Sequence, residues 1–519
     1  MKKKILVFAV MLPLLGSLAS CQKTAAYDPN NFLESGTAIV KNKVTLTFFA
    51  PLHPLHDKEG YNHMRLFQEM EKDTNIHIEW IYGATSNYSE IRGAQWQSKN
   101  RPDAFFLWNP VNEVSKYGQS GTIADLSENI TKYAPNYNAI LAANPSYRSK
   151  ALMNGKMYSF LSINDVPRDQ TFKQFINQKW LKALNLTMPT TLEEYRNVLT
   201  HFKEDDPNGN GIPDEIPLSS ASLYQSRNFL MSAFGHPTTG VEEQDGTIIY
   251  VPELEAYRQY LDYAHSLFSA GLLDNNTFTM DERALAAKGA NVGSFDGAAA
   301  YLIVGKDKDA DYTAIPPLLA DSSVTKTWLG FNNVTPTALI VNSACPYQRE
   351  IVRWMDYLYS QKGIELQSFG LEGTDWDWTD ASQSQFLFHV PEGMGIEEYR
   401  GTITPAVGLG NASYFSKDFV LKEKNEYTER INQEVADAHY LDVLKIPLPN
   451  LVFTDEEASS SSVIQTDLDI YMEVFEQKVI TGKLTLTDQE WANHLANLNK
   501  LKVADLLSIY QNAYERSEK

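Results

Sequence analysis

The chain has 519 residues, of which 43% are hydrophobic and 12% aromatic, a composition typical of a globular protein large enough for two lobes. It carries 65 acidic against 45 basic residues, and its formal net charge is -20. Nucleic-acid binding requires a basic surface, so we expect no nucleic-acid partner. Beyond the N-terminus no apolar run approaches the roughly 20 residues that span a bilayer.

The first residues have the pattern of an export signal. Lys2 to Lys4 precede an apolar run from Ile5 to Leu15, and Leu18-Ala19-Ser20-Cys21 follows. The apolar run is too short to cross a membrane, and small residues precede Cys21 as they do at a signal-peptidase site. This arrangement resembles the bacterial lipobox, which implies that Cys21 is acylated and begins the mature protein. An ordinary secretory signal with an incidental cysteine is the alternative. We expect lipid anchoring at the extracytoplasmic face of a bacterial cell membrane.

Apolar periodicity predicts alternating strands and helices after a polar, turn-rich spacer at 22–42. Strands are expected at Val44–Phe49, Ile76–Ile81 and Asp103–Leu107. A helix containing Met64, Phe67 and Met70 separates the first two strands, and a helix at 90–99 separates the next two. This alternation predicts a largely parallel sheet that helices cover on both faces.

The middle of the chain is predicted to be helical, and strands return after it. The expected helices there are Leu192–Phe202, Leu254–Phe268 and Asp281–Lys288, and the expected strands are Val292–Phe295 and Ala338–Val341. After Arg349 helices dominate, at Glu350–Gln361, Tyr427–Ala438, Thr466–Thr481 and Asp488–Tyr514. This order predicts two lobes that the chain crosses more than once, with a ligand site between them.

The sharpest internal motif is Asp-Pro-Asn-Gly-Asn-Gly-Ile-Pro-Asp-Glu at 206–215. Oxygen-bearing side chains occupy positions 1, 3, 5 and 9 of this loop and glycine occupies position 6, as in an EF-hand calcium loop. Pro217 stands where an EF-hand has its bidentate glutamate, so another carboxylate would have to close the shell. A plain Asn-Gly-Pro turn is the alternative. The expected ligands of a structural calcium ion are Asp206, Asn208, Asn210, the Ile212 carbonyl, Asp214 and Glu215.

Several short segments carry a family resemblance. They are, in order, Arg101–Ala104, Gly155–Tyr158, Trp180–Leu186, Pro189–Tyr195, the loop at 206–215, Val352–Ser360, Gly370–Gly373, and the tail around Trp491, Tyr510 and Tyr514. In this order they resemble the lipoprotein solute-binding proteins of bacterial carbohydrate ABC importers, extracellular solute-binding family 1. The resemblance covers nearly the whole mature chain. Asn177-Gln178-Lys179 and Trp376-Asp377-Trp378 depart from the family pattern.

The resemblance implies an α/β, bilobal, periplasmic-binding-protein-like fold of type II with a helix-rich C-terminal lobe. It also implies a monomeric, non-catalytic receptor that captures a carbohydrate, expected to be an oligosaccharide, for the transmembrane subunits of an ABC permease. The expected division is a signal peptide at 1–20, a lipidated tether at 21–43, lobe 1 at 44–165, lobe 2 at 166–290, a return to lobe 1 at 291–345, and a helix-rich second lobe with a hinge-crossing tail at 346–519.

A sugar site needs aromatic platforms for the C–H faces of the rings and fixed polar groups for the hydroxyl edges. The chain has 9 Trp, 27 Tyr and 24 Phe, more aromatic surface than one core requires. Candidates follow predicted strand ends or interrupt polar loops, and a packed or merely exposed side chain is the alternative for each. The predicted ligand-binding residues are Trp108, Asn109, Tyr158, Arg168, Asp296, Trp328, Phe331, Asn332, Trp376 and Trp378.

Two other classes of protein remain open at this point. A surface-anchored glycoside hydrolase would need two carboxylates across a cleft, and Asp296 with Asp375 or Glu372 are the candidates. A sugar-sensing ectodomain is the third hypothesis.

Overall fold

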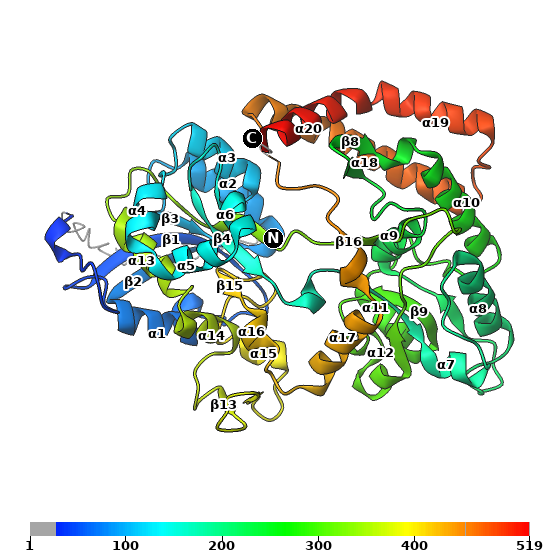
Figure 1. Ribbon diagram of the computed structural model, residues 1–519, viewed down its shortest axis with the longest axis horizontal. Coiled ribbons are helices and arrows are strands. Elements are labelled where there is room, and N and C mark those ends of the chain that lie inside the picture. The colour runs from blue at the N-terminus through cyan, green and yellow to red at the C-terminus, as the bar shows by residue number, and fades with distance from the viewer. Residues whose placement is uncertain (1–26, 452, 518–519) are drawn as a thin grey trace, which may run out of the picture.

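The computed structural model describes residues 27–451 and 453–517, which form two lobes side by side (Figure 1). Lobe 1 contains a six-stranded sheet and lobe 2 a four-stranded sheet. Both sheets are covered by helices, so the predicted bilobal α/β architecture is confirmed. Within these ranges no helix has the length and apolar character that crossing a bilayer requires.

The lobe 1 sheet consists, in spatial order, of β15 (Tyr414–Phe415), β4 (Ser159–Asn164), β12 (Val334–Val341), β3 (Ala104–Phe106), β1 (Val44–Leu52) and β2 (Ile76–Ala84). β1 is parallel to β2 and β3, as predicted, but β12 is antiparallel to both of its neighbours. The sheet is therefore mixed. β12 enters it from lobe 2 through an inter-lobe segment instead of through a covering helix.

Successive side chains of a strand point to opposite faces of the sheet, so Phe48 and Phe49 of β1 belong to two separate hydrophobic cores. Phe48 packs edge-on against Trp354, and Phe49 stacks on Tyr88. The helices of lobe 1 are α1 (Arg65–Thr74), α2 (Tyr88–Gln97), α3 (Val111–Gln119), α4 (Ser127–Tyr133), α5 (Pro135–Ala143), α6 (Pro145–Ala151), α13 (Gln348–Tyr357), α14 (Gln361–Phe369), α15 (Ile396–Arg400) and α16 (Lys417–Val420). The hairpin of β13 (Trp376–Trp378) and β14 (Phe386–Phe388) extends from this lobe.

Lobe 2 is built on β10 (Tyr312–Ala314), β5 (Lys173–Asn177), β9 (Val292–Gly297) and β6 (Ile216–Leu218), in that spatial order. Its helices are α7 (Gln178–Ala183), α8 (Leu192–Glu204), α9 (Tyr224–Ser232), α10 (Glu255–Ser269), α11 (Glu282–Lys288), α12 (Tyr301–Val304), α17 (Glu426–Asp437), α18 (Asp455–Ile480), α19 (Asp488–Lys500) and α20 (Val503–Ser517). Two short ribbons, β7 (Val241–Gln244) with β8 (Thr247–Tyr250) and β11 (Trp328–Leu329) with β16 (Leu444–Lys445), complete it.

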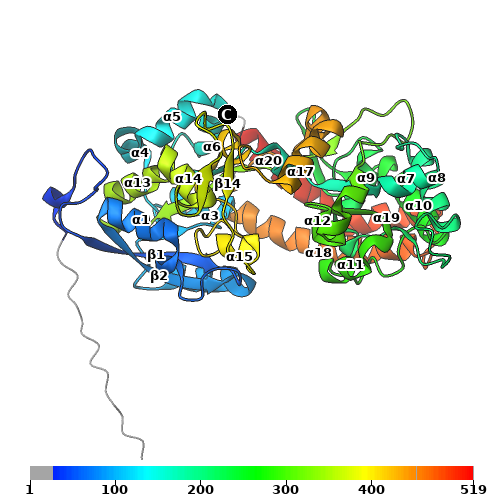
Figure 2. The same cartoon turned by 90° about the horizontal axis from the view of Figure 1, so that it is seen from below.

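The last three helices run along lobe 2 and bring α20 next to α3 of lobe 1 (Figures 1 and 2). α18 begins at Asp455, earlier than the predicted start at Thr466. Thr454 and Glu457 form a capping box at its N-terminus, and the four serines at 459–462 lie inside the helix. The capping signal at Thr454 and Glu457, which lies before the serine run, therefore determines where the helix starts.

The chain visits the two lobes in an order that differs from the prediction. β9 pairs with β5 and β6, so the return to lobe 1 begins near β12 instead of at residue 291. α13 and α14 pack on the lobe 1 core, so the segment after 346 stays in lobe 1 and only re-enters lobe 2 at α17. A buried strand has the same apolar pattern in either sheet, which is why the sequence did not assign β9 correctly.

Residues 27–43, here called the strap, are not a free spacer. Phe32 and Val40 are buried and form a β-bridge. Arg353 of α13 donates to backbone carbonyls of the strap, and the Arg349 guanidinium lies 4.3 Å from the centre of the Phe32 ring. The expected tether at 21–43 is therefore fixed to lobe 1 from residue 27 onward. Cys21 lies outside the described residues.

Candidate functional site

Within the described residues three segments join the lobes, at 165–172, 330–333 and 421–425, and hydrogen bonds connect the first two. The Asn164 amide donates to the Asn333 carbonyl at 2.9 Å, and the Asn333 side chain donates to the Asp169 carbonyl at 2.7 Å. The Phe331 amide donates to the Gln170 carbonyl at 2.8 Å. These bonds make the two segments a paired hinge between the lobes.

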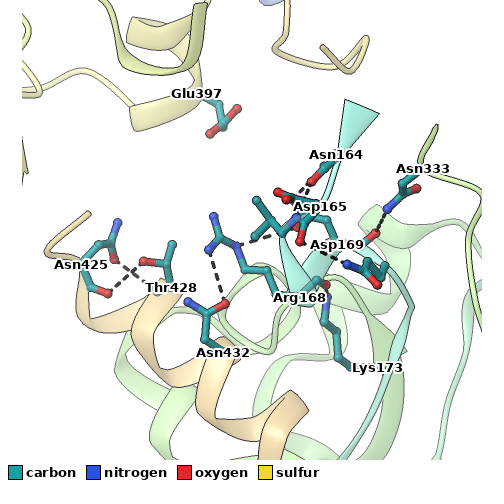
Figure 3. Close-up of polar contacts among 12 residues, drawn as sticks. Asn164, Asp165, Arg168, Asp169, Lys173, Asn333, Glu397, Asn425, Thr428 and Asn432 are labelled. Atoms are coloured by element: carbon teal, nitrogen blue, oxygen red, sulfur yellow. Dashed lines mark hydrogen bonds and ion pairs between the residues drawn. The ribbon is translucent and has the colours of Figure 1, made fainter. Parts of the chain in front are cut away.

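A cavity of about 660 Å³ lies between the lobes beside this hinge. Lobe 1 contributes residues 390–411, lobe 2 contributes 298–306 and the start of α17, and the hinge lies between them. We call this space the inter-lobe cavity. Its lining includes the polar side chains of Arg168, Glu397, Asn425 and Thr428 (Figure 3) and the hydroxyl-bearing ring of Tyr301.

Local structure fixes the polar side chains on the lobe 2 side. Asn425 is the N-cap of α17 and accepts from the Tyr427 amide at 3.1 Å, while the Thr428 hydroxyl donates to the Asn425 carbonyl at 3.0 Å. The Arg168 guanidinium donates to Asn432 Oδ1 at 3.4 Å, and Lys173 Nζ donates to the Arg168 carbonyl. Arg168 is therefore attached to α17 and β5 of lobe 2.

Aromatic rings line the same side. Tyr301 of α12 and Tyr427 of α17 contact each other with ring centroids 5.2 Å apart, and both border the inter-lobe cavity. The Lys306 ammonium lies 5.0 Å from the centre of the Tyr427 ring. The lobe 2 wall thus combines an aromatic surface with hydrogen-bonding groups, the combination that a sugar ring requires.

Burial shifts the pKa values of three charged residues beneath this wall. It lowers the pKa of Lys173 to about 8. Burial and the nearby Asp309 raise the pKa of Glu434 to about 8, although Arg430 and Lys173 oppose this shift. Burial also raises the pKa of Glu423, against the attraction of Arg168 and Arg400.

We expect Glu434 to make stability depend on pH. Its folded pKa of about 8 exceeds its ordinary value of 4.5, so the folded chain holds a proton that the unfolded chain releases. The free energy of unfolding should fall between pH 4.5 and 8, by on the order of 2–4 kcal/mol from this group. Glu434→Gln should remove this part of the slope in urea unfolding measured across that range. Glu429→Gln, an exposed change on the same helix, is the control, and equal slopes for both variants would contradict the assignment.

The family can now be stated, because a family model described as bacterial extracellular solute-binding protein matches residues 65–368, more than half of the chain. The chain belongs to that family. Its members bind solutes, and the homologues of this chain are binding proteins of ABC transporters and not enzymes.

Relatives support the same assignment over most of the chain. The solute-binding protein is 27% identical to the fructooligosaccharide ABC transporter substrate-binding protein FusA of Streptococcus pneumoniae serotype 4, over 97% of this chain and 96% of FusA. It is 24% identical to the polygalacturonan/rhamnogalacturonan-binding protein YtcQ of Bacillus subtilis, over 72% and 74% of the two chains. The fold resembles that of an extracellular solute-binding protein from Bifidobacterium longum subsp. infantis, with a TM-score of 0.79, 21% identity and coverage of 93% and 100%.

Four predicted ligand-binding aromatics of this solute-binding protein lie in cores or pack against them instead. Trp328 is fully buried and stacks between Phe172 and Tyr440. Trp376 is buried in a small hydrophobic cluster of lobe 1, where its indole N–H donates to the Gly370 carbonyl at 3.1 Å. Trp378 is half-buried and packs edge-on against Trp376. Tyr158 packs in a lobe 1 core. Their positions near strand ends suggested a site, but the hairpin and ribbon around them provide enclosing partners that the sequence did not reveal.

The remaining candidates lie around the hinge and along the facing edges of the two lobes. Arg168 borders the inter-lobe cavity. Phe331 packs against the lobe 2 core, and Asn332 accepts from Lys150 at 3.2 Å and donates to Asn450 at 2.5 Å. These two residues of the second crossing therefore join segments of the protein and do not line the inter-lobe cavity.

Trp108 and Asn109 follow β3 in lobe 1 and border a shallow cavity of about 360 Å³. Trp108 is 37% exposed, and its indole N–H donates to the Leu409 carbonyl at 2.7 Å, so its ring is held at an open surface. Asn109 is buried, and its amide donates to the Phe105 and Thr337 carbonyls. Asn109 therefore fixes the loop, and Trp108 remains the candidate for ligand contact.

Two of the carboxylates proposed for a hydrolase, Asp375 and Asp296, have partners within their own lobes. Asp375 is fully buried, lies 2.7 Å from Arg65 and accepts from the Tyr399 hydroxyl at 2.6 Å. Asp296 accepts from Ser220 at 2.5 Å and Ser226 at 2.8 Å in lobe 2, and burial raises its pKa. Asp296 borders a side cavity of about 370 Å³ that shares Ala298 with the inter-lobe cavity. Asp375 is thus bonded inside lobe 1, whereas Asp296 borders a cavity next to the inter-lobe cavity.

The loop at 206–215 connects α8 to β6. The backbone amides of Asn210 and Gly211 donate to the Asp206 carboxylate at 3.1 and 2.9 Å, and the side-chain amide of Asn210 donates to Asp214 at 3.1 Å. Glu215 Oε1 is buried without a hydrogen-bond partner, and burial together with Asp206 and Asp214 raises its pKa. In the described ranges no three acidic, imidazole or thiol groups form a ready-made metal cluster.

Sequence reasoning missed Tyr301, Glu397, Asn425 and Thr428. Asn425 precedes Glu426 and Tyr427 as an N-cap precedes a helix, and this signal could have placed the start of α17. Nothing local distinguishes Tyr301 or Glu397, because their place in the cavity depends on how the two lobes meet.

Proposed function

We propose that this solute-binding protein captures an oligosaccharide in the inter-lobe cavity for an ABC importer. The observation that carries the proposal is the lobe 2 wall, where the Tyr301–Tyr427 ring pair stands beside Asn425, Thr428 and Arg168. The relatives favour this class of ligand, since FusA was solved in complex with kestose at a TM-score of 0.74 to this chain.

The roles within the cavity follow from chemistry. The tyrosine rings would stack against the apolar faces of sugar rings, while the Thr428 hydroxyl and the Asn425 amide would bond to sugar hydroxyls. Trp108 on lobe 1 would contact the ligand from the opposite side after closure. A cavity with walls from both lobes encloses its ligand only when the lobes close, so binding and closure are coupled.

Isothermal titration with kestose, nystose and a panel of neutral and acidic oligosaccharides tests this proposal. We expect one of them to bind without being consumed, and Tyr301→Ala to weaken that binding about tenfold or more, since a stacked ring contributes about 1–3 kcal/mol. Tyr133→Ala, a change of the same kind next to the strap, should leave the affinity unchanged. Turnover of a glycan, or equal affinity of both variants, would contradict the proposal.

We further infer a calcium ion at the 206–215 loop. The orphaned Glu215 oxygen and the Asp206 and Asp214 carboxylates provide the hard oxygen donors that calcium takes, and the Asn208 and Asn210 side chains could rotate to join them. A FusA structure with a TM-score of 0.74 is described as that of an EF-hand mutant. Nothing nucleophilic stands beside this loop in the sequence, so the ion would support lobe 2.

The N-terminal pattern supports lipid anchoring through Cys21 at the outer face of the cell membrane. A single acyl chain holds a protein only weakly, so stable anchoring needs more than one. The membrane partner would be the transmembrane subunits of the importer, and a monomer is sufficient to form the complete inter-lobe cavity.

A further inference from the structure

Opposite charges face each other across the inter-lobe cavity. Glu397 projects from α15 of lobe 1 with 49% of its side chain exposed, and its partner is Arg400 of the same helix at 2.8 Å. Arg168 projects from the lobe 2 side, and its nearest carboxylate, Asp169, is 3.8 Å away. Figure 3 shows the Arg168 guanidinium and the Glu397 carboxylate on opposite sides of the open space.

The two groups already share an electrostatic environment. Glu397 raises the pKa of Tyr301 and Arg168 lowers it, while burial gives the largest shift. For Glu423, too, Glu397 raises the pKa and Arg168 lowers it, beside the larger effect of burial. Tyr301 and Glu423 border the cavity, so the electrostatic fields of Arg168 and Glu397 overlap there.

The attachments of the two residues determine what closure does. Arg168 is held by Asn432 and Lys173 of lobe 2, whereas Glu397 belongs to lobe 1. A hinge rotation that closes the cavity brings these groups toward each other. Their attraction rises as the distance falls and as water leaves, and a guanidinium can bind a carboxylate with two parallel hydrogen bonds.

We propose that Arg168 and Glu397 form an ion pair across the closed cavity, and that this pair determines affinity by stabilising the closed state. The proposal rests on the proposed function only through lobe closure and is independent of the ligand's identity. It has an unusual consequence: the affinity for a neutral oligosaccharide should fall as the salt concentration rises.

Disulfide trapping tests the approach of the two residues without any ligand. In a Cys21→Ser background, where buried Cys345 is the other cysteine, Arg168→Cys with Glu397→Cys should cross-link under mild oxidation. Arg168→Cys with Glu398→Cys is the matched control, because Glu398 is exposed and does not border the cavity. If the first pair stays reduced while both of its thiols react with a maleimide, the proposal is wrong.

Charge reversal tests the ion pair itself. Spin labels at Lys99→Cys in lobe 1 and Lys182→Cys in lobe 2, both exposed, report the closed fraction by double electron–electron resonance, again without ligand. Arg168→Glu and Glu397→Arg should each lower the closed-to-open ratio about fivefold, and the double reversal should restore it. Glu398→Arg should have no effect. Equal ratios in all variants, or no rescue by the double reversal, would overturn the pair even if cross-linking succeeds. A failed sugar screen would affect only the proposed function.

Discussion

Trp328→Ala is expected to lower the free energy of unfolding by about 3–5 kcal/mol, the largest effect of any single change considered. The Trp328 ring is fully buried between Tyr440, at a centroid distance of 4.1 Å, and Phe172, at 4.7 Å. Removing it leaves a cavity where β11 meets β16, next to the second crossing. Thermal and urea unfolding, followed by circular dichroism, measure the loss.

A conservative variant separates packing from ligand contact at this position. Trp328→Phe keeps an aromatic ring between the same two neighbours and should cost less than half as much stability. Both variants should bind ligand with nearly unchanged affinity at temperatures where they are folded. If Trp328→Ala is as stable as the wild type but no longer binds ligand, Trp328 contacts the ligand and the prediction is wrong.

Calcium is expected to raise the melting temperature of the solute-binding protein by several degrees, and chelation should reverse this. An ion that binds only the folded loop adds about 2.7 kcal/mol when its concentration is 100 times the dissociation constant. The loop supports this expectation because Glu215 Oε1 is buried without a partner beside Asp206 and Asp214. Differential scanning fluorimetry with calcium and with EGTA is the measurement.

The variant Asp206→Ala with Asp214→Ala should melt at one temperature in both buffers. Asp205→Asn, next to the loop but outside the predicted ligand set, should keep the full calcium response. If the wild type itself melts identically with calcium and with EGTA, the loop is a plain turn.

Local sequence signals predicted the elements well and their partners less well. The alternating pattern at Ile76–Ile81 and the apolar run at Val292–Phe295 both became strands, β2 and β9. The sheet that β9 joined could not be read from its residues, because burial on both faces leaves the same pattern in either lobe. For the same reason β12 gave no sign that it would run antiparallel.

The site shows a similar division. Arg168 was found because it follows the first predicted lobe crossing, and it does border the inter-lobe cavity. Trp328 and Trp376 have the same residue type and loop context as a sugar platform, but Tyr440 and Phe419 cover them from distant parts of the sequence. Tyr301 and Glu397 are 96 residues apart and meet at one cavity only because the lobes are placed as they are.

The strap fixes the start of the described chain to lobe 1 and not to lobe 2. Arg349 and Arg353 fasten it to α13, so any surface that holds the N-terminus holds lobe 1. Closure of the lobes would then move lobe 2, together with α17–α20, relative to lobe 1 and the strap. A partner protein in the same membrane would then meet lobe 1 in a fixed position. It would detect ligand binding through the movement of lobe 2 alone.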